Sequence, residues 1–342
     1  MSIVLVAVLG ALIPTLLYVF LVWWLDRFEK EPFRLLALAF LWGAIPAALL
    51  SVLFELIFDL PLGFLGSESL AANLISASVN APLIEETCKG IALIGMVLIF
   101  RREFDSVLDG IVYGAMIGLG FAFTENSIAY FLPVLLEEGI AAGLVNIFLR
   151  AIVFGVNHAL WTGIVGAAIA YARLSRDRVR RLLVPVGGWL LAVTLHGIHN
   201  TGASLVEQTL CLSLLFSAAV DWFSVLVLLI VAILMLQQES QWIERGLVEE
   251  VRRGALAEAE FYLLRSARER LRARRRARQR GGRAASRVVG RYFQCATELA
   301  FKKQQLRSLG DEGGTLAEIQ RLRGELAALQ TEAYPWLDLP GA

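Results

Sequence analysis

Long apolar segments without charged side chains constrain this chain more than any other feature. The first 25 residues carry no charged side chain before Asp26, and a helix needs about 20 apolar residues to cross a bilayer. The sequence is 57% hydrophobic and 18% charged, whereas soluble domains are roughly 45–50% apolar and about 25% charged. These properties exclude a soluble enzyme, a collagen-like chain and a wholly disordered chain.

Seven apolar stretches predict seven membrane-spanning helices and an all-α, polytopic membrane helix bundle. They cover roughly residues 1–25, 34–58, 72–100, 106–133, 145–172, 182–206 and 211–236. The first stretch lacks the positive n-region and the small-residue cleavage site of a signal peptide, so it is predicted to be a retained span.

The connecting segments predict the orientation of the bundle. Lys and Arg occur in the loops near 26–34, 101–102 and 173–181, and are absent from those near 59–71, 134–144 and 207–210. Because basic loops stay on the cytoplasmic side, this alternation places the N-terminus outside and the C-terminus in the cytoplasm.

The charge balance divides the chain into two predicted domains. Residues 1–236 carry 12 Lys and Arg against 17 Asp and Glu, whereas residues 237–342 carry 20 against 14. We therefore predict a transmembrane domain over 1–236 and a small cytoplasmic, basic helical domain over 237–342.

Within the basic domain the sequence predicts helices over 238–279, 285–308 and 315–331, with a break at Gly281–Gly282. Twelve arginines and one glutamate lie between Arg265 and Arg291. This density favours attraction to anionic lipids at the membrane surface, and without a recognisable motif nucleic acid is not an expected partner.

The cysteines predict neither disulfides nor a cysteine-based metal site. Cys88, Cys211 and Cys295 are an odd number, lie far apart and form no CxxC pair.

Ionisable residues inside the predicted spans indicate a functional site, because each costs roughly 2.5–3.5 kcal/mol to insert. Glu85, Glu86 and Lys89 lie in the third span, Glu125 and Asn126 in the fourth, His158 in the fifth, and His196, His199 and Asn200 in the sixth. Facing lipid would be costly for all of them, so we expect them to converge on an interior cavity.

Helical spacing supports this convergence, because residues four apart share one helix face. Pairs at this spacing are Glu85 with Lys89, Phe121 with Glu125, His158 with Thr162, and His196 with Asn200. Structural roles remain alternatives for some of them. In the structural interpretation, Glu86 and Lys89 form a buried ion pair that only fixes helix packing, and Asn126 only hydrogen-bonds a neighbouring helix. Trp161 then shapes the cavity, and His199 is a packing histidine.

Four ordered motifs resemble those of the PrsW family of intramembrane proteases, within the superfamily of CAAX prenyl endopeptidases and their bacterial ABI relatives. The motifs are Glu85-Glu86-x-x-Lys89, Phe121-x-x-x-Glu125-Asn126, His158-x-x-Trp161-Thr162 and His196-x-x-x-Asn200. The segment 26–32 also resembles the acidic first loop of the family, although Lys30 replaces its usual proline. The resemblance covers roughly residues 20–205.

The resemblance implies an integral, multi-pass endopeptidase of a bacterial-type cell membrane. It implies the first cut of an anti-sigma factor, and a glutamate-activated water, in a family first treated as metallopeptidases. Glu125 stands where the prenyl endopeptidases carry a histidine, which makes CAAX processing the less expected activity.

The residues themselves allow one mechanism for peptide hydrolysis. Glu85 is the predicted base with Glu86 as the next candidate, and His158 and Glu125 orient the water. His196 and Asn200 donate to the oxyanion, and Lys89 balances the carboxylates. The expected substrate is a single-pass membrane protein, cut near its outer juxtamembrane side.

Three alternatives remain open at this point. A zinc ion held by His158, His196 and either Glu85 or Glu125 would make the enzyme a metallopeptidase; because HExxH is absent, we favour the version without a metal. The chain would otherwise be a non-proteolytic scaffold related to the gamma-secretase scaffold subunit, or a proton-coupled transporter.

Overall fold

The computed structural model describes residues 2–28, 30–65, 69–311, 313–337 and 339. Within these residues the regular elements are all helical and no strand occurs, which confirms the predicted all-α class. The chain forms two compact units. The membrane unit comprises Met1–Leu25, Glu31–Arg173 and Asp177–Ala232, and the tail unit comprises Asp26–Lys30, Leu174–Arg176 and Ile233–Ala342.

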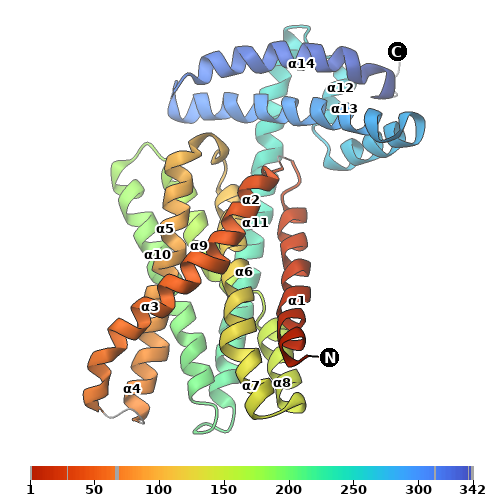
Figure 1. Cartoon of the computed structure of the whole chain (residues 1–342). Helices are drawn as coiled ribbons and strands as arrows, with labels where there is room; N and C mark the ends of the chain where they lie inside the picture. The colour runs from red at the N-terminus through yellow and green to blue at the C-terminus, as the bar shows by residue number, and fades with distance from the viewer. Residues whose placement is uncertain (1, 29, 66–68, 312, 338, 340–342) are drawn as a thin grey trace. The chain divides into compact units, whose positions relative to one another are not determined.

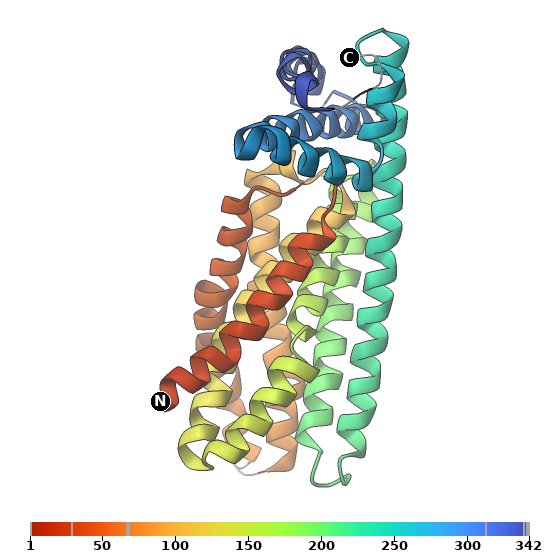
Figure 2. The same cartoon turned by 90° about the vertical axis from the view of Figure 1, so that its right-hand side faces the viewer.

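Six helical stretches in the described part of the chain are long and apolar enough to cross a membrane. They are Ile3–Leu25, Phe33–Leu62, Val107–Glu137, Ile140–Arg173, Arg178–Ser204 and Leu212–Arg252. They correspond to all the predicted spans except the third. In the membrane unit they run alongside one another (Figures 1 and 2).

The third predicted span is helical through α4 (Leu70–Ile75), the π-helical segment η3 (Ser76–Asn80) and α5 (Ala81–Ile99). It contains the charged group Glu85, Glu86 and Lys89, which sets it apart in composition from the six more apolar stretches.

Several spans consist of consecutive helical segments. The second contains α2 (Phe33–Trp42), η1 (Gly43–Ala47), α3 (Ala48–Asp59) and η2 (Leu60–Leu65); the fourth contains α6 (Val107–Thr124), η5 (Glu125–Phe131) and α7 (Leu132–Glu137); the fifth contains α8 (Ile140–Ile147), η6 (Phe148–Val153) and α9 (Asn157–Arg173). The short helix η4 (Arg101–Glu103) follows α5, and α1 (Ile3–Leu25), α10 (Arg178–Ser204) and α11 (Leu212–Arg252) are single helices.

Close packing of α6 against α9 brings the fourth and fifth spans together. A Cβ atom added at Gly118 would lie 2.1 Å from the carbonyl oxygen of His158, and one added at Gly110 would lie 2.1 Å from that of Gly166. Small residues four apart let membrane helices approach to backbone contact. The glycines of α6 therefore place the start of α9, with His158, directly beside α6.

The tail unit has its own hydrophobic core, built by the end of α11, α12 (Glu258–Leu264), α13 (Ala267–Leu309) and α14 (Thr315–Leu337). The helices α13 and α14 lie side by side (Figure 1). Phe28, from the segment after α1, joins this core.

The predicted helix over 238–279 is wrong in detail, because three helices cover it. Gly254 has φ +72° where α11 ends, a conformation that favours glycine, and α13 begins only at Ala267. The predicted break at Gly281–Gly282 is confirmed, since neither residue has helical dihedral angles. Among the sequence features discussed above, Glu29 and the side chain of Arg102 lie outside the described residues.

Candidate active site

Lys89 lies at the centre of a buried polar cluster in the membrane unit. Its Nζ is 2.9 Å from Glu85 Oε2 and 2.8 Å from Glu86 Oε1, and none of the three side chains is more than 6% exposed. The ammonium also lies over the ring of Phe121, 3.8 Å from its centroid. Two carboxylates on one helix turn are thus compensated by one buried cation.

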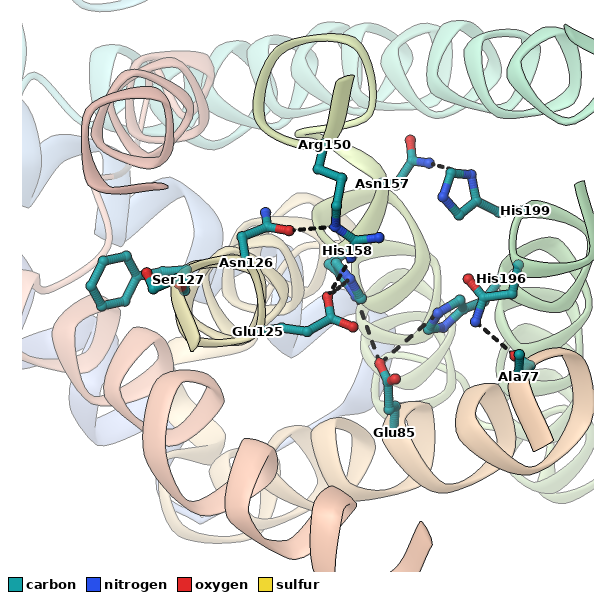
Figure 3. A network of polar contacts seen from close by, with 12 residues as sticks. Ala77, Glu85, Glu125, Asn126, Ser127, Arg150, Asn157, His158, His196 and His199 are labelled. Carbon is teal, nitrogen blue, oxygen red and sulfur yellow. Dashed lines mark hydrogen bonds and ion pairs between the residues drawn. The ribbon is translucent and has the colours of Figure 1, made fainter. Parts of the chain in front are cut away.

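The two glutamates differ in how fully they are bound. Glu86 is bonded to Lys89, to Thr162 Oγ1 at 3.2 Å and to His196 Nδ1 at 3.2 Å. In the described residues Glu85 forms one hydrogen bond, from Lys89, and its Oε2 lies 3.9 Å from nitrogens of both His158 and His196 (Figure 3). Glu85 therefore keeps more acceptor capacity for a bound molecule than Glu86 does.

His158 connects the fourth span to this cluster. Its Nε2 lies 2.9 Å from Glu125 Oε2, and its Nδ1 lies 3.0 Å from Lys89 Nζ. Because Lys89 is a donor only, His158 Nδ1 accepts that bond and Nε2 carries the proton toward Glu125. The contacts hold the imidazole ring in one orientation.

His196 is fixed by stacking as well as by hydrogen bonding. The Trp161 ring lies parallel to it, with centroids 3.9 Å apart and an interplanar angle of 14°. Its Nδ1 is bonded to Glu86, which leaves Nε2 on the side of Glu85. The rings of His158 and His196 are 5.2 Å apart and nearly perpendicular.

Arg150, a residue that the sequence analysis missed, joins the cluster from η6. Its Nη2 donates to Glu125 Oε2 at 3.0 Å and its Nε donates to Asn126 Oδ1 at 2.8 Å, as Figure 3 shows. Its guanidinium also stacks on Tyr130. Glu125 therefore lies between His158 and Arg150, and Asn126 supports Arg150.

Asn200 lies one turn after His196 and its amide is engaged with the backbone. Its Nδ2 donates to the carbonyl oxygen of Ala77 at 2.8 Å. Ala77 is part of η3, Glu125 opens η5, and Arg150 lies in η6. π-helical segments are frequent at functional sites because they change which side chains face a cavity.

A small cavity borders one side of the cluster, where it is lined by His158 and His196 and not by Glu85, Glu86 or Lys89. Its volume, measured as the space that the centre of a water molecule can occupy, is about 20 Å³. This is room for about one water molecule. Its walls include Glu125, Asn126, Arg150, Asn157, His158, Trp161, His196, His199 and Asn200.

The same cluster has the donor chemistry of a metal site. Ligand atoms of Glu85, Glu86, His158 and His196 all lie within 4.8 Å of one another, and imidazole and carboxylate are the ligands of catalytic zinc. Lys89 Nζ bonds to three of these four residues. The residues therefore fit a divalent cation in type, number and burial, and Lys89 would compete with it for the donor atoms.

Sequence reasoning also missed Asp221, an aspartate within the apolar helix α11. It is 1% exposed and binds His199, whose Nδ1 lies 2.7 Å from Asp221 Oδ2. The signal was present in the sequence, because a lone carboxylate in an apolar span requires a partner.

The chain matches known proteases over the membrane unit. The profile of the PrsW family intramembrane metalloproteases matches residues 31–236, more than half of the chain. "Protease PrsW" of Clostridioides difficile is 30% identical over 56% of this chain and 76% of its own length. "Protease PrsW" of Geobacillus kaustophilus is 31% identical over 51% and 69%, and that of Bacillus subtilis is 27% identical over 58% and 83%. No solved structure matches the chain.

The profile match spans the helices that supply Glu85, Glu125, His158 and His196, and the pairwise alignments cover 76% and 69% of the length of the first two relatives. The chain therefore belongs to the PrsW family of intramembrane metalloproteases.

Proposed function

We propose that this chain is an endopeptidase that hydrolyses peptide bonds of single-pass membrane proteins at the Glu85 cluster. The observation that carries the proposal is the grouping of a partly unbonded carboxylate with two imidazoles, buried among apolar helices beside a water-sized cavity. First-site cleavage of an anti-sigma factor is the substrate class that the family resemblance favours. A place in the CAAX prenyl endopeptidase superfamily belongs to the same proposal.

Each residue has a chemical role in this mechanism. Glu85 accepts a proton from the attacking water, since its Oε2 faces both imidazoles and it is less fully bonded than Glu86. His158 and Glu125 orient the water, His158 by holding the Glu125 carboxylate. Because His196 Nδ1 donates to Glu86, the free Nε2 of His196 donates to the oxyanion on the carbonyl in the doubly protonated form of the ring. Glu86, Thr162 and Lys89 hold this arrangement in place.

Asn200 keeps its proposed role as a second oxyanion donor only if its amide leaves Ala77 when substrate binds, because the carbonyl of Ala77 now accepts its N–H. A zinc ion held by three residues of the group Glu85, Glu86, His158 and His196 would supply Lewis acidity and a more acidic water in its open position. The version without a metal, with Glu85 as base, remains the one we favour.

The orientation and the tail complete the proposal. The N-terminus lies outside and the C-terminus in the cytoplasm, as the basic loops indicate. The transmembrane protease domain covers 1–236, and the basic domain 237–342 lies against anionic lipids and docks no nucleic acid.

The test uses purified full-length protein in detergent with a single-pass membrane substrate. We expect Glu85→Gln and His196→Ala to abolish cleavage while Glu138→Gln, an exposed loop carboxylate, keeps it. Elemental analysis and chelators run in parallel decide the metal. Stoichiometric zinc whose removal stops cleavage would make Glu85 a ligand, whereas unchanged cleavage by both site variants would contradict the proposed site.

A further inference from the structure

A second buried acid–imidazole pair borders the proposed site. His199 Nδ1 lies 2.7 Å from Asp221 Oδ2, and Asn157 Nδ2 donates to the same oxygen at 2.9 Å. The three residues come from α10, α11 and α9, respectively. An aspartate inside an apolar span requires polar partners, and here the partners are His199 and Asn157.

In the described residues His199 forms hydrogen bonds through one ring nitrogen, as His196 does, but it is not paired with Glu85 or Glu86. Both nitrogens of His158 are bonded, and those of His196 face the two glutamates. In the described residues no hydrogen bond reaches His199 Nε2. Its other nitrogen is held by a carboxylate, the arrangement that orients an imidazole for proton transfer in hydrolases.

The position of His199 gives it access to a bound substrate. Its ring lines the water-sized cavity together with Glu125, His158 and His196, and Figure 3 shows it beside Asn157. The His199 side chain is 10% exposed, whereas that of Asp221 is 1% exposed. The imidazole therefore faces the cavity, and the carboxylate stays behind it.

Aromatic rings separate His199 from the glutamate cluster. Trp161 stacks on His196 at 3.9 Å and lies 5.6 Å from His199, and the edge of Phe154 packs on His199 at 4.8 Å. The other titratable groups that line the cavity are Glu125, Arg150, His158 and His196. Of the two nearby carboxylates, Glu125 pairs with Arg150 and His158, and Asp221 pairs with His199.

We propose that His199, oriented by Asp221 and Asn157, is the general acid that protonates the leaving amine. The inference rests on the proposed function, whose mechanism assigns no residue to the protonation of that nitrogen. Peptide amines leave poorly as anions, and a positioned acid contributes typically about 10²- to 10⁴-fold to the rate.

The proton and electron balance of the step is closed. Water adds to the carbonyl carbon as its proton passes to Glu85, and the C–O bond forms as the carbonyl electron pair moves to oxygen. His199 enters the step as the imidazolium, with its Nδ1–H on Asp221. When the tetrahedral intermediate collapses, an oxyanion electron pair re-forms the C=O bond, the C–N bond breaks, its electron pair goes to nitrogen, and His199 Nε2 gives its proton to that nitrogen. The proton on Glu85 then returns through solvent to His199.

The experiment compares two substrates of one sequence, a peptide amide and an activated aryl ester whose leaving group needs no proton. We expect His199→Gln to lower kcat on the amide by about 10²-fold or more, with KM unchanged, and to lower kcat on the ester less than tenfold. Asp221→Asn shows the same pattern as His199→Gln, with a larger loss of kcat on the amide than on the ester, but each loss is smaller than in His199→Gln. Glu85→Gln loses both activities, which separates the acid from the base.

Thr201→Val on α10 is the matched control, because the Thr201 hydroxyl donates to the carbonyl of Gly197 within its own helix. This variant keeps the wild-type ratio of amide to ester rates. Equal losses on both substrates in His199→Gln and Asp221→Asn, or no loss on either, would overturn the acid role. Should His199→Gln fail to fold, the ratio in Asp221→Asn decides. If the wild type cleaves neither substrate, the proposed function itself fails.

Discussion

The two units of this protein distribute polarity in opposite ways. In the membrane unit apolar side chains such as Leu49, Leu98 and Ile13 are exposed, while Glu86 and Lys89 are fully buried. In the tail unit Leu299 and Val289 form the core, and most of the arginines are exposed. Lipid tails are as apolar as leucine side chains, so there is no hydrophobic driving force to bury apolar side chains between membrane helices. The interior of a membrane protein is therefore available for polar chemistry.

Buried charges nevertheless occur in both units, and their surroundings differ. In the tail unit Glu250 is bonded to Lys303 and to Arg323, whose Nη2 is 2.8 Å away. Within the described residues the hydrogen bonds of Glu250 include no imidazole, and both of its carboxylate oxygens accept hydrogen bonds. In the membrane unit Glu85 keeps acceptor capacity beside two imidazoles. An incompletely hydrogen-bonded charge, rather than burial alone, therefore distinguishes the candidate site from the buried ion pairs of the tail unit.

Removing the central cation of the membrane unit should have the largest effect. Lys89→Met leaves Glu85 and Glu86 without their common partner, and removing one member of a buried ion pair typically costs about 3–5 kcal/mol. We expect a large loss of thermal stability in detergent together with the loss of cleavage. The control Arg275→Met removes an exposed tail arginine and changes neither. Wild-type stability in Lys89→Met would show that the carboxylates do not depend on that ammonium.

The next effect concerns backbone contact between α6 and α9. In Gly118→Ala the new Cβ would meet the carbonyl oxygen of His158 at 2.1 Å, whereas Gly187→Ala on α10 has nothing within 4 Å. Overpacking costs typically about 1–3 kcal/mol, and here it also displaces His158. We expect lower stability and slower cleavage in Gly118→Ala alone. Similar behaviour of the two variants would contradict the close packing.

A smaller effect is expected in the tail unit. Burial would raise the pKa of Glu250, but hydrogen bonds with Arg323 and Lys303 hold it below its usual value. Its stabilising contribution is therefore present above the unfolded-state pKa and is lost as pH falls through the lowered folded pKa. Limited proteolysis should show faster tail digestion in Glu250→Gln near neutral pH, and a flatter dependence on acidic pH than in the wild type. An unchanged pH profile would argue against this ion pair.

The smallest expected effect is a difference in the chemical reactivity of two cysteines, without a change in stability. Burial, with nearby Glu325 and Glu298, raises the pKa of Cys295 to about 12, whereas Cys211 is exposed. Because the thiolate is the reactive form, maleimide applied to the folded protein should label Cys211 much faster than Cys295. Comparable labelling of the two would show that the tail core is open.

The sequence predicts the helical class and the grouping of the motif residues well, because both follow from rules of spacing and burial. Glu85, Glu125, His158 and His196 lie on four separate spans, and one-turn polar stripes in apolar helices have to meet in the interior. Arg150 and Asp221 obey the same rule, but each stands alone in its span. Their roles became visible only through their partners.

Other features depend on backbone geometry that residue types do not encode. The π-helical segments that contain Ala77, Glu125 and Arg150 shift the helical phase by one residue, so a spacing rule for ideal helices cannot place those side chains. The end of α11 near Gly254 was likewise missed, since one glycine in an arginine-rich helical pattern is a weak signal.

We propose that the incompletely bound carboxylate of the membrane unit, and not the buried carboxylate of the tail unit, takes part in hydrolysis. The direct measurement is the single-turnover cleavage rate of one membrane substrate by folded Glu85→Gln and Glu250→Gln, prepared in parallel. The account predicts no detectable cleavage by Glu85→Gln and a rate close to wild type for Glu250→Gln. Wild-type cleavage by Glu85→Gln would contradict it.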